Sequence, residues 1–350
     1  MKRPSALRRL VSTLGSQAQL LVGFAGGTIA FATDMISSGG WWLVLKSSGW
    51  VVLAGSLSWT LVKTHRTDRL VQGKKPFPIL IAIGRPRSES IRALPLLQSA
   101  VTKQSGFKDF SAVEQQFNVK YEEMFVHRAE QLPPNPTAWH DFLGEAQQEL
   151  RPFLQRISGE RVYHVAIQGP ASLAIGLGAV FGTRSPVVAY HYTADAYLPV
   201  LNLTQDTRQV KTYLPADAFT HITVAYPLTV GSDTAVVLDM AGHNPIGDTK
   251  DYLAKQMAGT PLVEVRNTYG GNLTEADWAP VVQEIFAAIN TLQRNQDIQR
   301  IHLFHSMPVP LAFGLGMALG YFADITVYNW EREQSTYFPV LHLNHIHSLL

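Results

Sequence analysis

A repeat within the 350-residue chain restricts its possible folds more than any other pattern in the sequence. Residues 173–182 read LAIGLGAVFG and residues 311–320 read LAFGLGMALG, and each run follows an apolar or β-branched stretch. The agreement continues further along both copies, with closely similar spacing. VVAY at 187–190 matches ITVY at 325–328, and LPVLNL at 198–203 matches FPVLHL at 338–343. Agreement over one long supersecondary unit indicates that the segment has been duplicated.

Each copy of the repeat reads as strand, loop, helix and strand, which is half of a parallel α/β layer with a right-handed crossover. A further candidate strand precedes each copy, at residues 78–83 and 235–239. We therefore predict a domain over about residues 75–350, built from two Rossmann-like halves at about 75–203 and 232–350. A strand-like segment at 221–226 lies in the stretch between them.

Polar loops follow four of the predicted strands, beginning at Gly84, Gln168, Met240 and His305. Ligands of open parallel sheets bind beyond the carboxyl ends of the strands. Free N–H groups at helix starts suit anions, and an arginine such as Arg85 can bind a phosphate through two hydrogen bonds. A single loop of this kind is more often a plain helix cap, but the four together indicate a ligand site.

Aromatic residues end the last strand of each copy, at YHY in the first and YNW in the second. They could stack a base while an asparagine reads its edge, although aromatic residues are equally common at the rim of a core. From these positions we predict eight ligand contacts: Arg85, Ser88, Gln168, His243, Ser306, Met307, Asn329 and Trp330.

The glycines of the repeat do not form a dinucleotide-binding fingerprint. Their spacing is GxGxxxG within the helix, whereas the fingerprint needs its glycines at the turn from strand to helix. Small residues recur at four-residue steps in both copies, as Ala174, Gly178 and Gly182, and as Ala312, Gly316 and Gly320. This stripe predicts that each helix packs closely against a neighbour.

The first 65 residues form a separate, strongly apolar region. Between residues 20 and 62 the only charged residues are Asp34 and Lys46, and basic residues flank both ends. About 20 apolar residues cross a bilayer, and basic flanks mark the cytoplasmic side. We predict a transmembrane hairpin within residues 1–65, with spans at about 14–36 and 41–62, in preference to a cleaved signal peptide or buried core helices.

Composition argues against several classes of function. The 29 basic and 27 acidic residues leave a net charge of only +2, so we expect no DNA or RNA partner. The chain has no cysteine, which excludes disulfides and cysteine nucleophiles. The C-terminal histidines lack the spacing of a metal site, and no phosphate-loop, nucleophile-elbow or kinase motif is present. We expect no metal, no cofactor and no catalytic residue.

Two runs near the C-terminus resemble the end of the SAVED domain. They are IHLFHSMPVPLAFGLGMALG at 301–320 and ITVYNWEREQSTYFPVLHL at 325–343. The likeness is specific over about the last fifty residues, which include Ser306 and Trp330. The rest of the domain agrees in length and in having two halves, with looser motifs. The resemblance implies a SAVED domain made of two fused CARF-like halves.

SAVED domains sense cyclic oligonucleotides in bacterial antiphage systems such as CBASS, and they are fused to effectors of several kinds. With its membrane helices, this chain is similar to a transmembrane SAVED effector. The resemblance implies that a cyclic di- or trinucleotide activates it, that ligand binding drives homo-oligomerisation, and that it has no enzymatic activity. Clustered hairpins would then disrupt the bilayer of the bacterial inner membrane and cause abortive infection, with both termini of the two-helix protein in the cytoplasm.

Two alternatives remain open at the level of sequence. One is a membrane-tethered, Rossmann-like enzyme that processes a nucleotide, with His243 or His305 as its base. The other is a membrane scaffold whose α/β domain binds a protein partner.

Overall fold

The computed structural model describes residues 75–350 except for 107–110, 112–113, 115–119, 121–123, 157–159, 274–276, 296 and 350. The described residues belong to one compact unit, Gln72–Leu350. The predicted membrane hairpin, residues 1–65, lies outside the described residues. Among the helices of the described part, none is both long and apolar enough to span a bilayer.

The first half of the unit contains a five-stranded sheet, sheet 1, in the order β2-β1-β3-β4-β5. Its strands are β1 (Lys75–Ile83), β2 (Phe125–Arg128), β3 (Arg161–Gln168), β4 (Val187–Thr193) and β5 (Ala196–Asn202). The first four are parallel, and β5 is antiparallel to β4. The helices of this half are α3 (Arg87–Ser90), α4 (Ala93–Ser105), α6 (Pro136–Arg156) and α7 (Ala171–Phe181).

The second half contains a six-stranded sheet, sheet 2, in the order β11-β10-β9-β7-β8-β6. Its strands are β6 (Ile222–Ala225), β7 (Asp233–Asp239), β8 (Leu262–Asn267), β9 (Arg300–Ser306), β10 (Ile325–Glu331) and β11 (Thr336–His342). The edge strands β6 and β11 are antiparallel to their neighbours. The α-helices are α8 (Pro245–Gln256), α9 (Ala279–Gln293) and α10 (Val309–Leu319), and the 3-10 helices are η2 (Gln209–Lys211), η3 (Ala216–Ala218) and η4 (Leu343–Leu349).

The predicted duplication is visible in the details of both sheets. The units β3-α7-β4 and β9-α10-β10 are parallel crossovers, as the sequence predicts. Each continues into an antiparallel hairpin, so the sheets are mixed rather than wholly parallel. The first hairpin reverses at Ala194 and Asp195, which have φ values of 47° and 58°, because left-handed residues match the twist of paired strands. Both hairpins are irregular at matched places, before Tyr190 and before Tyr328.

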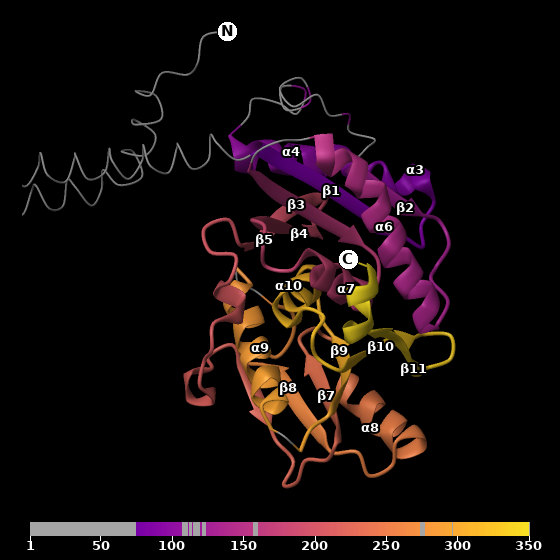
Figure 1. Ribbon diagram of the computed structural model, residues 1–350, viewed down its shortest axis with the longest axis vertical. Helices are drawn as coiled ribbons and strands as arrows, with labels where there is room; N and C mark the ends of the chain where they lie inside the picture. Colours follow the sequence, from indigo (N-terminus) through magenta and orange to yellow (C-terminus); the bar gives the residue numbers. More distant parts are fainter. Residues whose placement is uncertain are drawn as a thin grey trace, which may run out of the picture. The chain divides into compact units, whose positions relative to one another are not determined.

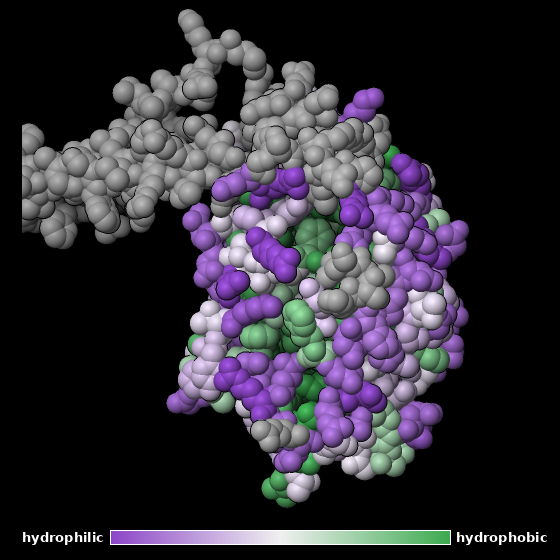
Figure 2. Space-filling model, viewed as in Figure 1, coloured by the Kyte–Doolittle hydropathy of each residue, from purple (hydrophilic) through white to green (hydrophobic). Residues whose placement is uncertain are grey.

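The helices and sheets alternate in five layers (Figure 1). The α7–α10 pair lies between the sheets, α4 packs on the outer face of sheet 1, and α8 packs on the outer face of sheet 2. One hydrophobic core joins the inner faces of both sheets through the middle helices, and each outer face has a smaller core of its own. Figure 2 shows a hollow on the face in view, with hydrophobic residues inside it and hydrophilic residues on both sides.

The small residues of the repeat bring α7 and α10 together. A Cβ on Gly178 would overlap the carbonyl oxygen of Phe313, and a Cβ on Gly316 would overlap that of Ile175. The predicted close packing is confirmed at these two glycines. Gly182 and Gly320 have a different role, because they end the helices with φ values of 58° and 67°, which side chains disfavour.

Candidate ligand-binding site

The carboxyl ends of the two sheets meet where α7 and α10 begin. Ser172, in the first turn of α7, donates a hydrogen bond to Asn329 Oδ1 at 3.0 Å, and its hydroxyl lies 2.9 Å from His305 Nε2. In the matched position of the other copy, Pro310 of α10 lines a small void together with Ile167 and Tyr190. The ends of β3, β4, β9 and β10 are thus gathered at one place.

Both helices begin at this place without a side-chain cap. Their N-cap residues are Pro170 and Pro308, and neither makes a side-chain hydrogen bond to the helix. The first N–H groups of a helix have no partner within the helix, and the helix dipole adds partial positive charge there. The junction of the two sheets therefore carries two helix N-termini suited to an anion.

His305 is an uncharged, hydrogen-bonding group within this junction. Burial lowers the pKa of its imidazole to about 4. Its Nδ1 is buried, and no described residue forms a hydrogen bond with it. Ser172 is completely buried, so a substrate cannot reach the Ser172–His305 pair as a nucleophile and base. The hydrogen bond between Ser172 and His305 instead joins the two halves of the unit.

In the first half, the predicted contacts gather around Tyr197. Gln168 Nε2 donates to the Tyr197 hydroxyl at 3.1 Å, while Gln168 Oε1 is buried without a partner among the described residues. Burial raises the pKa of Tyr197 to about 12, and the nearby charge of Arg85 opposes that rise. Ser88 is exposed in the short helix α3. The loops after β1 and β3 therefore lie close together.

In the second half, the loops after β7 and β9 are joined through the backbone. The N–H of Met240 donates to the carbonyl oxygen of Ser306 at 2.8 Å. His243 is exposed farther along the first of these loops, and the Met307 side chain is buried in the central core. Trp330 packs edge-on against Tyr337, with ring centroids 5.0 Å apart.

The predicted residues thus form two groups rather than one cluster of direct contacts. Arg85 and Gln168 lie near Tyr197 in the first half, while Trp330 contacts Tyr337 in the second. Only for Asn329 does a hydrogen bond among the described residues link a predicted contact to the other half. Sequence reasoning missed Tyr197 and Tyr337, although the repeat places these identical residues at matched positions.

Comparison with known families decides the identity of the domain. The sequence model of the SAVED family, "SMODS-associated and fused to various effectors sensor domain", matches residues 146–343, which is more than half of the chain. The chain belongs to the SAVED family. The predicted membership of the SAVED family is confirmed. Six of the eight predicted contacts lie within the matched residues, while Arg85 and Ser88 precede them. No curated protein matches the sequence.

Solved SAVED structures share the fold. One is the Acinetobacter baumannii Cap4 SAVED/CARF-domain containing receptor with the cyclic trinucleotide 2'3'3'-cAAA, at 16% identity and a TM-score of 0.51, covering 81% of this chain and 54% of that one. The same receptor with 3'3'3'-cAAA has 16% identity and a TM-score of 0.50, covering 74% of this chain and 62% of that one. This SAVED chain therefore spans less than two thirds of those receptors, and the likeness supports the predicted two-part α/β fold.

Proposed function

We propose that this SAVED protein is a sensor of a cyclic di- or trinucleotide. The observation that carries the proposal is the meeting of both sheets' carboxyl ends with the uncapped starts of α7 and α10. Phosphates of the ligand bind near these N–H groups and Arg85, and a base stacks on Trp330. The two Cap4 receptor structures, which contain cyclic trinucleotides, support this ligand class.

The remaining contacts follow from the same placement. Gln168 and Ser88 face the ligand from the first half, and Asn329, Ser306, Met307 and His243 surround it from the second. Gln168 Oε1 is buried without a partner among the described residues, so a donor on the ligand or an ordered water would satisfy it. The site binds the ligand and has no catalytic role in this proposal.

Ligand binding is coupled to assembly and to the membrane. A ligand held between neighbouring protomers stabilises only the assembled state, so it shifts the population toward oligomers. In our proposal, residues 1–65 form a two-helix hairpin in the bacterial inner membrane, with both termini in the cytoplasm. Assembly concentrates the hairpins, so weak contacts between their helices are sufficient for the hairpins to associate. The clustered hairpins disrupt the membrane and stop an infected cell.

Titration of the full-length chain with cyclic di- and trinucleotides tests the sensor. We expect one ligand to raise the unfolding temperature and to produce a larger species. Trp330→Ala should weaken binding by about 5- to 150-fold, because stacking of a base on an aromatic ring is worth about 1–3 kcal/mol. Phe322→Ala is the matched control, since Phe322 is an aromatic residue that is 83% exposed and precedes the opposite end of β10.

The sensor proposal would be overturned if no cyclic di- or trinucleotide changed the unfolding temperature or the size of the species. Conversion of the ligand to product would favour the enzyme alternative instead.

Expression of the chain with and without residues 1–62 tests the membrane step. We expect the shortened chain to keep ligand binding and to lose toxicity in cells that make the ligand. Retained ligand binding serves as the control for folding. Equal toxicity of both chains would contradict a membrane effector.

A further inference from the structure

A cavity lies on the α8 face of sheet 2, at the opposite strand ends from Ser172 and His305. Its volume is about 340 Å³, and its lining includes Arg300, Asp324, Thr326, His342, Asn344 and His345. These residues come from the beginnings of β9 and β10, the end of β11, and η4. Small-molecule pockets range over about 300–1,000 Å³, so this one suits a nucleoside-sized molecule better than a cyclic trinucleotide.

The repeat shows that the fold itself does not require polar groups here. Arg300 corresponds to Val162 in the first copy, and Thr326 corresponds to Val188. Both valines are buried in the outer core of sheet 1 under α4. The His302–Tyr328 hydrogen bond of 3.0 Å, in contrast, has an equivalent of 2.8 Å between His164 and Tyr190. The two copies therefore share this support, and the second copy has polar residues where the first has buried valines.

The charges around the cavity favour an uncharged ligand. Arg300 lies 3.4 Å from an oxygen of Asp324 and 3.8 Å from one of Asp233, so two carboxylates balance its charge. These two carboxylates would repel an anionic ligand. Burial lowers the pKa of His342, with the nearby His345 adding to the effect, so this imidazole is neutral at pH 7.

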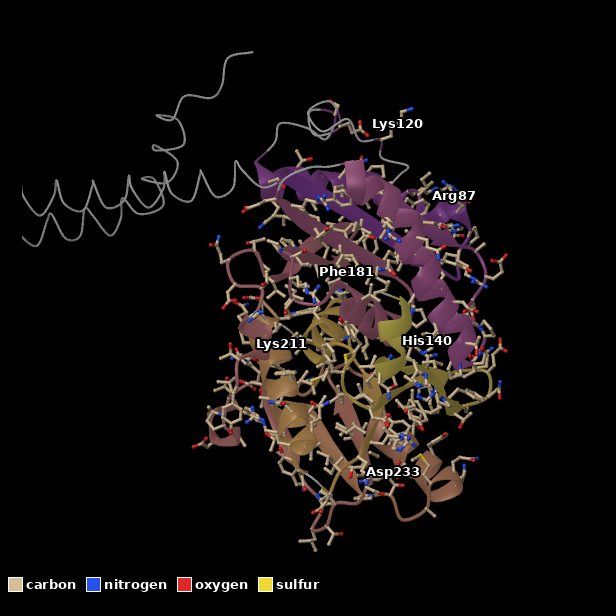
Figure 3. All side chains as sticks on the ribbon, in the orientation of Figure 1. Arg87, Lys120, His140, Phe181, Lys211 and Asp233 are labelled. Carbon is tan, nitrogen blue, oxygen red and sulfur yellow. The ribbon has the colours of Figure 1, made fainter. Side chains whose placement is uncertain are left out.

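The shape and hydrogen-bonding groups of the lining indicate a planar ligand. The rings of His342 and His345 lie 5.1 Å apart, and His140 of α6, labelled in Figure 3, lies 6.0 Å from His345. Pro339 also lines the cavity. Asn344 lines the cavity, and its Oδ1 is buried and accepts no hydrogen bond from the described residues. An unpaired buried acceptor favours a ligand that donates.

We propose that this cavity is a second binding site, for a nucleoside or free base whose exocyclic amino group donates to Asn344. The ring of the base lies against the imidazoles of His342 and His345. This site is separate from the proposed cyclic-nucleotide site and does not depend on it.

Calorimetric titration of the full-length chain with matched nucleosides tests the second site. Adenosine and inosine differ in having an amino or a carbonyl group at one ring position, and cytidine and uridine form a second such pair. We expect an amino-bearing nucleoside to bind and its carbonyl partner to bind at least tenfold more weakly, because a site built around a donor leaves its acceptor unpaired with the analogue.

Substitutions taken from the first copy identify the site. Asn344→Thr introduces the residue that the first copy carries at Thr204, and we expect at least a tenfold loss of affinity. The reciprocal change Thr204→Asn should leave affinity unchanged. If Asn344→Thr lowers the unfolding temperature, Thr326→Val serves as a second cavity variant. It introduces the valine that the first copy has at Val188, and it should also lower the affinity. No binding of any of the four nucleosides, or unchanged affinity in both cavity variants, would overturn the proposal.

Discussion

Ser172 and Pro310 hold matched positions in the two copies, and they meet the opposite half in different ways. Ser172 makes hydrogen bonds to His305 and Asn329, whereas Pro310 lines a small void together with Ile167 and makes no side-chain hydrogen bond. Asn329 could be predicted as a strand-end residue. Its partner Ser172 could not, because the two residues are 157 positions apart and their contact depends on how the halves pack.

Two histidines with lowered pKa values should make the protein sensitive to acid. Burial lowers the pKa of His164 to about 3 and that of His305 to about 4, against about 6.5 in the unfolded chain. Below pH 6.5 the unfolded state binds protons that the folded state does not bind. The free energy of unfolding therefore falls as the pH falls from about 6.5 toward 4, and this effect ends below the folded pKa values.

The size of this effect can be measured by denaturant unfolding at pH 8, 6 and 5. We expect each histidine to contribute on the order of 2 kcal/mol of lost stability at pH 5 relative to pH 8. His305→Gln cannot titrate in this range, so its stability should fall less between the same pH values. An equal fall in the variant and the native chain would contradict a buried, neutral His305.

At the level of elements, the repeat predicted the strands and helices well, because periodicity and β-branched runs are local signals. It did not reveal that β5 and β11 would run antiparallel. The reversal at Ala194 and Asp195 carries no glycine, and left-handed backbone at such residues is uncommon. Packing of the hairpin on the outer core, with Tyr197 buried there, compensates for that cost.

The α7–α10 contact should tolerate no added side chain. Gly178→Ala places a Cβ on the Phe313 carbonyl, and because backbone must move to accept it, we expect a loss of about 1–3 kcal/mol or more of unfolding free energy. Gly247→Ala in α8 is the matched control, since its Cβ would meet only Asn244 at 3.6 Å. Alanine favours helix, so this control should gain about 0.5–1 kcal/mol.

Denaturant unfolding of the two glycine variants would measure both changes. A stability loss of equal size in both, or none in Gly178→Ala, would show that α7 and α10 do not pack closely at Gly178.

At the scale of the described unit, one core joins both halves. It includes Ile79 of β1, Ile175 of α7, Phe313 of α10 and Val236 of β7. The sequence predicted two halves but did not predict how their cores are connected, since hydrophobic patterns show which face is buried but not what covers it. The structure shows instead that the inner faces of both sheets share their covering helices.

The shared core predicts that the two halves unfold together. We expect amides of β3 and β9 to exchange hydrogen with the same opening free energy and the same dependence on denaturant. The reason is that the inner face of each sheet loses its cover when the other half unfolds. Native-state hydrogen exchange with mass spectrometry measures both strands in one experiment. Much weaker protection of one strand would show that its half opens independently.

Fusion of the two copies in one chain also affects how the site can change by mutation. In a dimer of identical subunits, every mutation appears on both sides of the symmetry axis. Here residue 172 and residue 310 are encoded separately, so a hydroxyl arose at one position and an imino acid at the other. A ring-shaped molecule bound at this junction would meet two unlike sides, and its orientation in the site would be unique.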